Sequence, residues 1–147
     1  MRDSYESLLK EQGFVLIYTR GVSMEPMLHE GKEQSLIHSV PAIGREPEKY
    51  DVVLFKRGQE YVLHRIVGRK GDLFRIRGDN CYGCDLVKRE EIHGILAGFY
   101  RGDRYVDCET DRDYLRYARR RCLFFPYRWT VLKLKTYWKA VIKRIKK

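Results

Sequence analysis

The sequence is 147 residues long, with 44% hydrophobic and 34% charged residues, which is typical of a soluble globular protein with a charged appendage. This length predicts one domain that can bury a core. The formal net charge of +10 is unevenly distributed. Residues 111–147 hold 13 Lys or Arg and 2 Asp or Glu, whereas the other 110 residues hold 17 and 18, so the basic character belongs to the C-terminal segment.

The distribution of apolar residues bears on cellular location. The N-terminus is charged and shows no apolar core of signal-peptide length. No stretch approaches the ~18 continuous apolar residues that a membrane-spanning helix requires. We therefore expect a cytoplasmic protein that is attached, if at all, peripherally to the inner membrane face.

Four cysteines occur, at Cys81, Cys84, Cys108 and Cys122. Thiols stay reduced in the cytoplasm, so we expect all four to be free. The Cys-x-x-Cys spacing of the first two is compatible with zinc or with a redox pair. Because the spacing to the other two fits no zinc pattern, we predict no metal and no cofactor.

Hydrophobic periodicity divides the chain into three segments. Residues 1–13 are predicted to contain a short helix, with Ser4 as its cap and Gly13 as its end. Residues 14–106 predict short strands joined by tight turns, and residues 111–147 predict a basic, amphipathic helical segment. The expected fold is mainly β: a coiled antiparallel β domain followed by C-terminal helices.

The individual strands and helices follow from apolar runs and from turn residues. Strands are predicted from residue 14 to near Ser23 and at residues 51–56, 61–68, 72–77 and 92–100. The stretch 29–49 is irregular, although residues 35–40 inside it are compatible with a strand. One helix is predicted from Asp111 to about Cys122, before Pro126, and a second from about 127 to 146.

Ser23 follows the apolar run Phe14–Tyr18, which predicts a buried strand. Pro26 cannot extend a sheet ladder, so this strand is expected to end near Ser23, and Gly21 gives the backbone freedom there. A hydroxyl at a strand end can be exposed and yet rigidly held, as a nucleophile must be. Taken alone, Ser23 is better explained as an ordinary turn residue, because Ser is common in turns.

His64 lies in the middle of a predicted strand. Alternation places it on one face with Val62 and Ile66, while Leu63 and Arg65 point to the other. An imidazole on an apolar face is partly desolvated, which disfavours its charged form and keeps it neutral, as a general base must be. The alternative is a histidine hydrogen-bonded within a β core.

Two candidate acids, Asp79 and Asp85, lie in the stretch 78–85. A carboxylate that accepts a hydrogen bond from an imidazole fixes its tautomer and stabilises its cation. Either residue could do this if the loop folds back over the strand of His64. The alternative is that Gly78-Asp79-Asn80 is simple turn chemistry.

Five blocks together resemble, in order, the catalytic domain of the serine peptidases that include type I signal peptidases and LexA-like self-cleaving repressors. The resemblance covers about residues 14–106. The blocks are Gly21-Val22-Ser23-Met24-Glu25-Pro26, Tyr50-Asp51-Val52-Val53-Leu54-Phe55, Val62-Leu63-His64-Arg65-Ile66-Val67-Gly68, Arg77-Gly78-Asp79-Asn80 and Glu91-Ile92-His93-Gly94-Ile95-Leu96.

The base position is similar to that of the archaeal and endoplasmic-reticulum signal peptidases, which use His where most relatives use Lys. That type also has an Asp six residues after the Asp of the Gly-Asp-Asn turn, and Asp85 is six residues after Asp79. The resemblance implies that Ser23 is the nucleophile, His64 the base and Asp85 its orienting acid, with Asp79 in support.

The same resemblance implies a substrate class. Signal peptidases cut an extended peptide after small residues, so we expect a peptide or precursor-protein substrate, contacted by Met24 and Pro26 beside the nucleophile. Signal peptidases usually carry a Ser two residues before the nucleophile, but here that residue is Gly21. The alternative function is a non-catalytic or self-cleaving interaction module with a basic tail.

The C-terminal segment carries an apolar stripe among cations. Residues 127–147 contain no acid, and their Lys and Arg surround apolar residues at helical spacing. Such a helix fits an anionic membrane surface, and it equally fits docking on the β domain. Nucleic acid is a weaker alternative, because a stripe with Trp suits packing or lipid better than phosphate. The stripe comprises Leu134, Trp138, Val141, Ile142 and Ile145.

Overall fold

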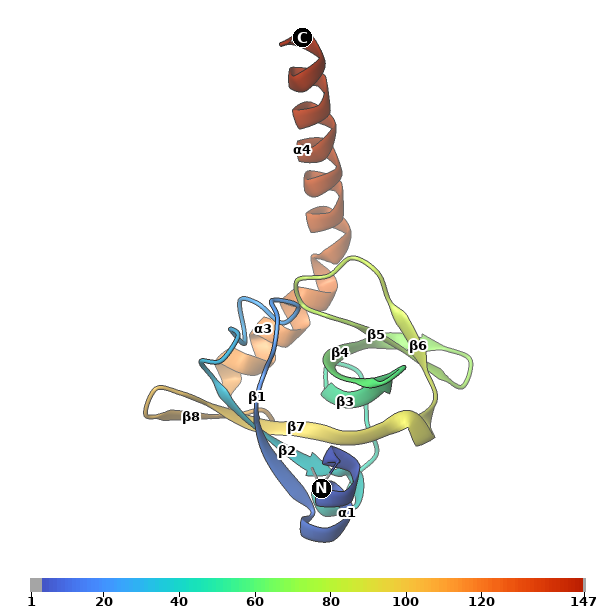
Figure 1. Cartoon of the computed structure of the whole chain (residues 1–147), viewed down its shortest axis with the longest axis vertical. Coiled ribbons are helices and arrows are strands. Elements are labelled where there is room, and N and C mark those ends of the chain that lie inside the picture. Colours follow the sequence, from blue (N-terminus) through green and yellow to red (C-terminus); the bar gives the residue numbers. More distant parts are fainter. Residues whose placement is uncertain (1–3, 147) are drawn as a thin grey trace.

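The computed structural model describes residues 4–146 (Figure 1). Its centre is one antiparallel sheet of eight strands in the order β1-β2-β7-β3-β4-β5-β6, with β8 paired to β7. The mainly β fold with C-terminal helices is confirmed. The strands are β1 (Phe14–Tyr18), β2 (Gln34–Ser39), β3 (Val52–Arg57), β4 (Glu60–Lys70), β5 (Leu73–Arg77), β6 (Asp85–Val87), β7 (Ile92–Arg101) and β8 (Arg104–Asp107).

The helices lie at the two ends of the chain and in short connections. They are α1 (Tyr5–Gln12), α2 (Val40–Ile43), the 3-10 turn η1 (Arg89–Glu91), α3 (Arg112–Leu123) and α4 (Phe125–Ile145). The Ser4 side chain accepts a hydrogen bond from the Ser7 N–H, and Gly13 ends α1 with φ +81°. Both features agree with the predicted N-terminal helix.

β1 is an edge strand that differs from the prediction. Val15 and Ile17 face the core, but Phe14, Leu16 and Tyr18 are exposed, so the apolar run is buried on one face rather than both. The strand also ends at Tyr18, well before Ser23. A loop of residues 19–31 follows the strand. A hydrogen bond of 3.1 Å from the Gly31 N–H to the Thr19 carbonyl closes this loop.

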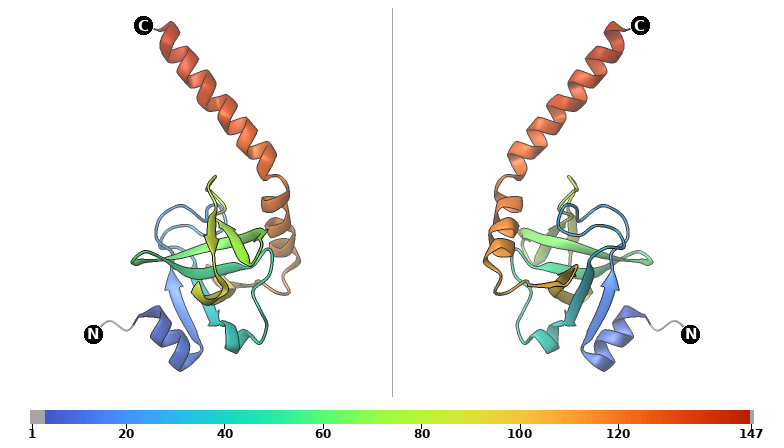
Figure 2. Two further views of the ribbon diagram at one scale, coloured as in Figure 1. Left: turned by 90° about the vertical axis from the view of Figure 1, so that its right-hand side faces the viewer. Right: turned by 90° about the vertical axis from the view of Figure 1, so that its left-hand side faces the viewer.

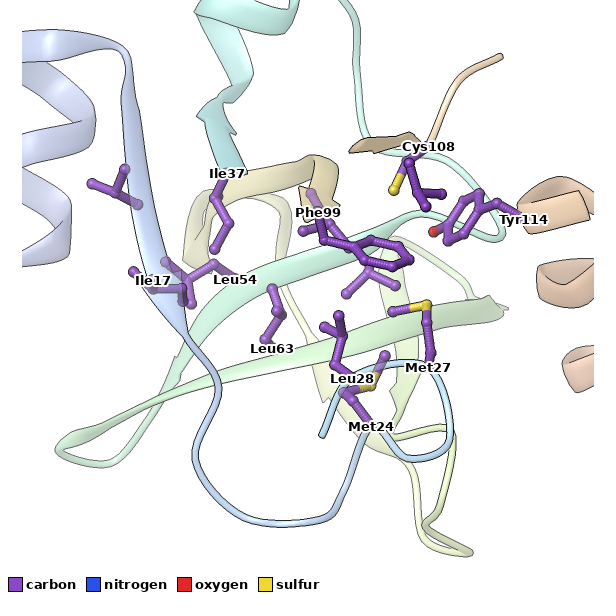
Figure 3. Packing of buried hydrophobic residues seen from close by; sticks show 14 of the residues in the cluster. Ile17, Met24, Met27, Leu28, Ile37, Leu54, Leu63, Phe99, Cys108 and Tyr114 are labelled. Atoms are coloured by element: carbon purple, nitrogen blue, oxygen red, sulfur yellow. The ribbon is translucent and has the colours of Figure 1, made fainter. Parts of the chain in front are cut away.

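The curved sheet encloses two apolar clusters. The larger one joins the inner face of β1 and β7 to the loop after β1. Figure 3 shows Met24, Met27 and Leu28 from that loop pointing toward Leu63 and Phe99. These anchors are buried, so the loop that carries Ser23 is fixed at one end by side-chain packing.

α3 and α4 differ in how they contact the β domain. α3 is capped by Asp111 and buries Tyr114 and Ala118, whereas α4 buries no residue and projects away from the domain (Figures 1 and 2). The alternative in which α4 docks on the β domain is therefore wrong. Among the helices described between residues 4 and 146, none is long and apolar enough to cross a bilayer.

Candidate active site

A cleft of about 1090 Å³ opens between the end of β1 and the β3–β4 hairpin. Ser23, His64 and Asp85 all line it, as does Met24. The fold thus brings together three predicted site residues that are far apart in the sequence. The chemistry available here depends on how each of them is held.

The turn that carries Ser23 is held from two sides. Its next residue, Met24, is only 2% exposed and packs into the core, so it anchors the turn and contributes little contact surface to a substrate. Asn80 donates from its backbone N–H to the Ser23 carbonyl (2.8 Å) and from its side chain to the Val22 carbonyl (3.1 Å). Pro26 is exposed and lies outside the described residues that line the cleft, so its expected substrate contact is not supported.

Gly78 is the point at which the Ser23 turn and the imidazole of His64 meet. A Cβ at this position would lie 2.7 Å from the Ser23 carbonyl oxygen, 2.8 Å from the Cys81 sulfur and 3.0 Å from His64 Nε2. Only glycine lets the backbone approach this closely. The Ser23 backbone and the imidazole therefore converge on one small volume.

We expect Gly78→Ala to disrupt this convergence. The new methyl would displace the Ser23 turn or the imidazole, so we expect at least a hundredfold loss of Ser23 reactivity, as for other ångström-scale misplacements. Gly83→Ala is the matched control, because no atom lies within 4 Å of its Cβ position. Equal reactivity of the two variants toward an acylating probe would contradict this account.

His64 is held in β4 with little exposure. The residue is 5% exposed, and the Phe55 ring lies 6.2 Å away, centroid to centroid. Burial lowers the pKa of His64 to about 4, and the nearby Arg57 charge acts in the same direction, against Asp85 and Asp79. The imidazole is therefore neutral near pH 7 and able to accept a proton.

This depressed pKa predicts a stability that falls in acid. Between pH 6.5 and 4 the unfolded chain binds a proton that the folded protein excludes, so the free energy of unfolding decreases as pH decreases. By pH 4 the loss is about 3 kcal/mol. Urea unfolding at pH 7 and pH 4 measures this loss. Between the two pH values, the free energy of unfolding should fall by about 3 kcal/mol more in the wild type than in His64→Gln. Parallel pH dependences of the two proteins would refute the prediction.

Asp85 lies near His64 but is held by a different partner. Its Oδ2 is 4.0 Å from His64 Nδ1 and is hydrogen-bonded by the Arg57 guanidinium. The buried Nδ1 has no hydrogen-bond partner, and no hydrogen bond connects the Ser23 hydroxyl to the ring, within residues 4–146. Neither the Ser23 hydroxyl nor the Asp85 carboxylate is therefore hydrogen-bonded to the imidazole in this part of the chain.

Asp79 has a structural position and does not contact the imidazole. Its two oxygens accept from Arg65 Nε and Nη2, each at 2.8 Å, and Oδ2 also accepts from the Tyr117 hydroxyl at 2.9 Å. Arg65 is fully buried and also donates to the Tyr50 carbonyl. The supporting role expected for Asp79 is thus indirect: it joins β4, the 78–85 loop and α3.

Sequence reasoning missed two polar residues of the site. Arg57 binds Asp85, and Asn80 secures Ser23, as described above. No local sequence signal distinguishes Arg57. Asn80 belongs to the Gly-Asp-Asn block, but its two contacts with the Ser23 turn become evident only in three dimensions. The four cysteines are unpaired, and Cys81 lines the cleft.

The site therefore combines a hydroxyl on an anchored turn, a neutral imidazole and a carboxylate in one open cleft. These groups are those of nucleophilic acyl transfer. Comparison with known protein families and with curated proteins finds no match to this chain.

Proposed function

We propose that this protein is a serine endopeptidase of the signal-peptidase type, which hydrolyses a peptide bond in a precursor peptide or protein. The observation that carries the proposal is the convergence of the Ser23 backbone and His64 Nε2 at Gly78. The open cleft around them is large enough for several residues of an extended chain, and the depressed pKa of His64 keeps its imidazole neutral, so that a ring nitrogen is free to accept a proton.

The reaction begins when Ser23 Oγ attacks the scissile carbonyl and His64 Nε2 takes the hydroxyl proton. His64 then gives that proton to the departing amine, which leaves an acyl ester on Ser23. Water, deprotonated by His64, attacks the ester and releases the acid product and free Ser23. Because Gly21 offers no side-chain donor, backbone N–H groups of the Ser23 turn stabilise the oxyanion.

Asp85 is the acid that we propose to stabilise the imidazolium formed during each proton transfer. Its carboxylate lies close enough to favour the cation, while Arg57 opposes it. A substrate that draws Arg57 away from Asp85 would free the carboxylate for Nδ1. This exchange would raise the basicity of His64 only when substrate is bound.

Cleavage of precursor peptides tests the function. Purified wild type and Ser23→Ala are incubated with candidate precursor peptides that contain small residues, and the products are identified by mass spectrometry. We expect defined internal cuts with the wild type and none with Ser23→Ala. The same cuts by both proteins would show that Ser23 is not the nucleophile, and would leave the interaction-module alternative.

We also propose that α4 attaches the protein peripherally to an anionic membrane, and so to the inner face of the cell membrane. Trp138 is 61% and Leu134 58% exposed, on a helix that buries no residue and projects away from the β domain beyond its first turn (Figure 2). The helix contains no acid, so two copies would repel each other, whereas anionic lipid would attract both. An apolar stripe flanked by cations matches an interfacial helix.

Vesicle flotation tests this attachment. We expect the wild type to float with phosphatidylglycerol vesicles more than with phosphatidylcholine vesicles, and less at high salt. Exchanging Leu134 and Trp138 for alanine should reduce flotation at least tenfold, whereas Leu86→Ala, which alters an exposed apolar residue on β6, should not. Equal flotation of all three proteins would exclude attachment through α4.

A further inference from the structure

A second, much smaller hollow lies behind the 78–85 loop, where α3 meets α4. Four arginines and a single carboxylate, that of Asp79, are among the residues that line it. Gly78 and Asp79 form part of its wall, so this segment separates the hollow from the cleft of Ser23 and His64. The four arginines are Arg65, Arg77, Arg121 and Arg128.

The Asp79 carboxylate is already paired with Arg65, which donates a hydrogen bond to each of its two oxygens. The other three guanidinium groups hydrogen-bond only to neutral groups within the described chain. Three positive charges are thus left without an anionic partner. These neutral contacts are Arg77 to the Cys84 thiol (3.8 Å), Arg121 to the Glu25 carbonyl (3.3 Å) and the Tyr117 hydroxyl (3.2 Å), and Arg128 to the Asp79 carbonyl (3.0 Å).

Arg77 shows most clearly that this cluster lacks an anion. It is 8% exposed, and its guanidinium carbon lies 3.2 Å from the centre of the Phe125 ring. Burial lowers the pKa of Arg77, and the positive charge of Arg128 adds to this effect. A buried guanidinium is ordinarily paired with an anion, because an uncompensated buried charge is costly.

We propose that this arginine cluster is a binding site for a phosphate group, carried either by inorganic phosphate or by the headgroup of an anionic lipid. Planar guanidinium groups donate two parallel hydrogen bonds to phosphate oxygens, and several of them neutralise its charge. The hollow encloses only about 10 Å³, which is room for one oxygen, so the rest of the phosphate would lie at its mouth beside Arg121 and Arg128.

The location of the site supports both sources of phosphate. Arg128 lies in the first turn of α4. The rest of this helix, which carries the apolar stripe and its cations, extends away from the β domain (Figure 1). A lipid headgroup at this junction would continue the contact that α4 makes with a membrane. The hydrogen bond from Arg128 to the Asp79 carbonyl also places this site next to Gly78, which separates the hollow from His64.

Inorganic phosphate is the probe that tests the site, in titration calorimetry at constant ionic strength with chloride as the reference salt. We compare the full-length wild type with Arg121→Gln/Arg128→Gln, and use Lys139→Gln/Lys143→Gln, which removes the same charge farther along α4, as the matched control. Circular dichroism checks folding. Arg128→Lys is the milder variant should the double exchange fail to fold.

We expect phosphate to bind the wild type and the lysine control within twofold of each other, and the arginine pair at least tenfold more weakly, because each lost hydrogen bond between charged groups costs about that factor. Arg128→Lys should bind with intermediate affinity. Absence of phosphate binding by the wild type, or equal weakening in the lysine control, would overturn the proposal.

Vesicles distinguish the two sources. The vesicles contain 20% phosphatidic acid. If the site takes a lipid phosphate, the Arg121→Gln/Arg128→Gln variant should bind them about tenfold more weakly than the lysine control does. If the two double variants bind vesicles equally, while the arginine variant still binds inorganic phosphate more weakly than the lysine control, the site is assigned to a soluble phosphate. Neither assay involves Ser23 chemistry, so this proposal and that of a peptidase fail separately.

Discussion

Replacing His64 with alanine is expected to slow acylation of Ser23 by about 10³-fold, because a positioned general base typically contributes 10²–10⁴. The imidazole is the one neutral base close to the Ser23 turn among the residues that line the cleft. The rate of labelling by a fluorophosphonate probe measures this effect directly, and at saturating probe it separates reactivity from binding.

His38→Ala is the matched control for that experiment. His38 lies on β2, outside the described lining of the cleft, so its loss should leave the labelling rate within twofold of the wild type. Because His64→Ala also removes a buried ring, the variant must be shown to be folded at the assay temperature. A folded His64→Ala protein that is labelled as fast as the wild type would contradict the assignment of the base.

The Asp79→Asn exchange is expected to lower the free energy of unfolding by about 3–5 kcal/mol, the usual cost of breaking a buried ion pair by removing one charge. Arg65 is 0% exposed and would remain charged, with only neutral acceptors such as the Tyr50 carbonyl. Urea unfolding measures the change. Asp72→Asn, in the exposed turn before β5, should change stability by less than about 0.5 kcal/mol.

A second variant separates the ion pair from general damage at this position. Exchanging both residues, as Arg65→Met with Asp79→Leu, removes the two charges together and should recover part of the stability lost by Asp79→Asn. Additive losses would mean that the pair is not coupled. The contact from Tyr117 to Asp79 predicts that α3 loosens first in the single variant, which amide exchange in α3 can detect.

The main strands were predictable because short runs rich in apolar residues are bounded by turn residues such as Gly58 and Gly71. β3, β4, β5 and β7 therefore lie close to where the sequence puts them. β6 and β8 were not predicted, since they contain only three and four residues, too few for a period of two to be recognised. The end of β1 at Tyr18 was missed because the turn depends on a hydrogen bond to Gly31, which no local pattern reveals.

The site was partly predictable, through the order of its motifs. Ser23, His64 and Asp85 do share one cleft. The ion pairs were not predictable, because Arg57 and Asp85 are 28 residues apart and Arg65 and Asp79 are 14 apart, on separate strands and loops. The sequence alone could therefore not decide which aspartate faces the imidazole, whereas the pairing of both Asp79 oxygens leaves Asp85 as the acid beside it.

Peptide mapping after fluorophosphonate treatment tests the central claim most directly. The wild type, Ser23→Ala and Ser7→Ala, which alters an exposed helix-cap contact, are treated alike and digested, and each adduct is located by mass spectrometry. The account predicts one adduct, on Ser23, in the wild type and in Ser7→Ala, and none in Ser23→Ala. An unlabelled wild type, or an adduct that persists in Ser23→Ala, would contradict it.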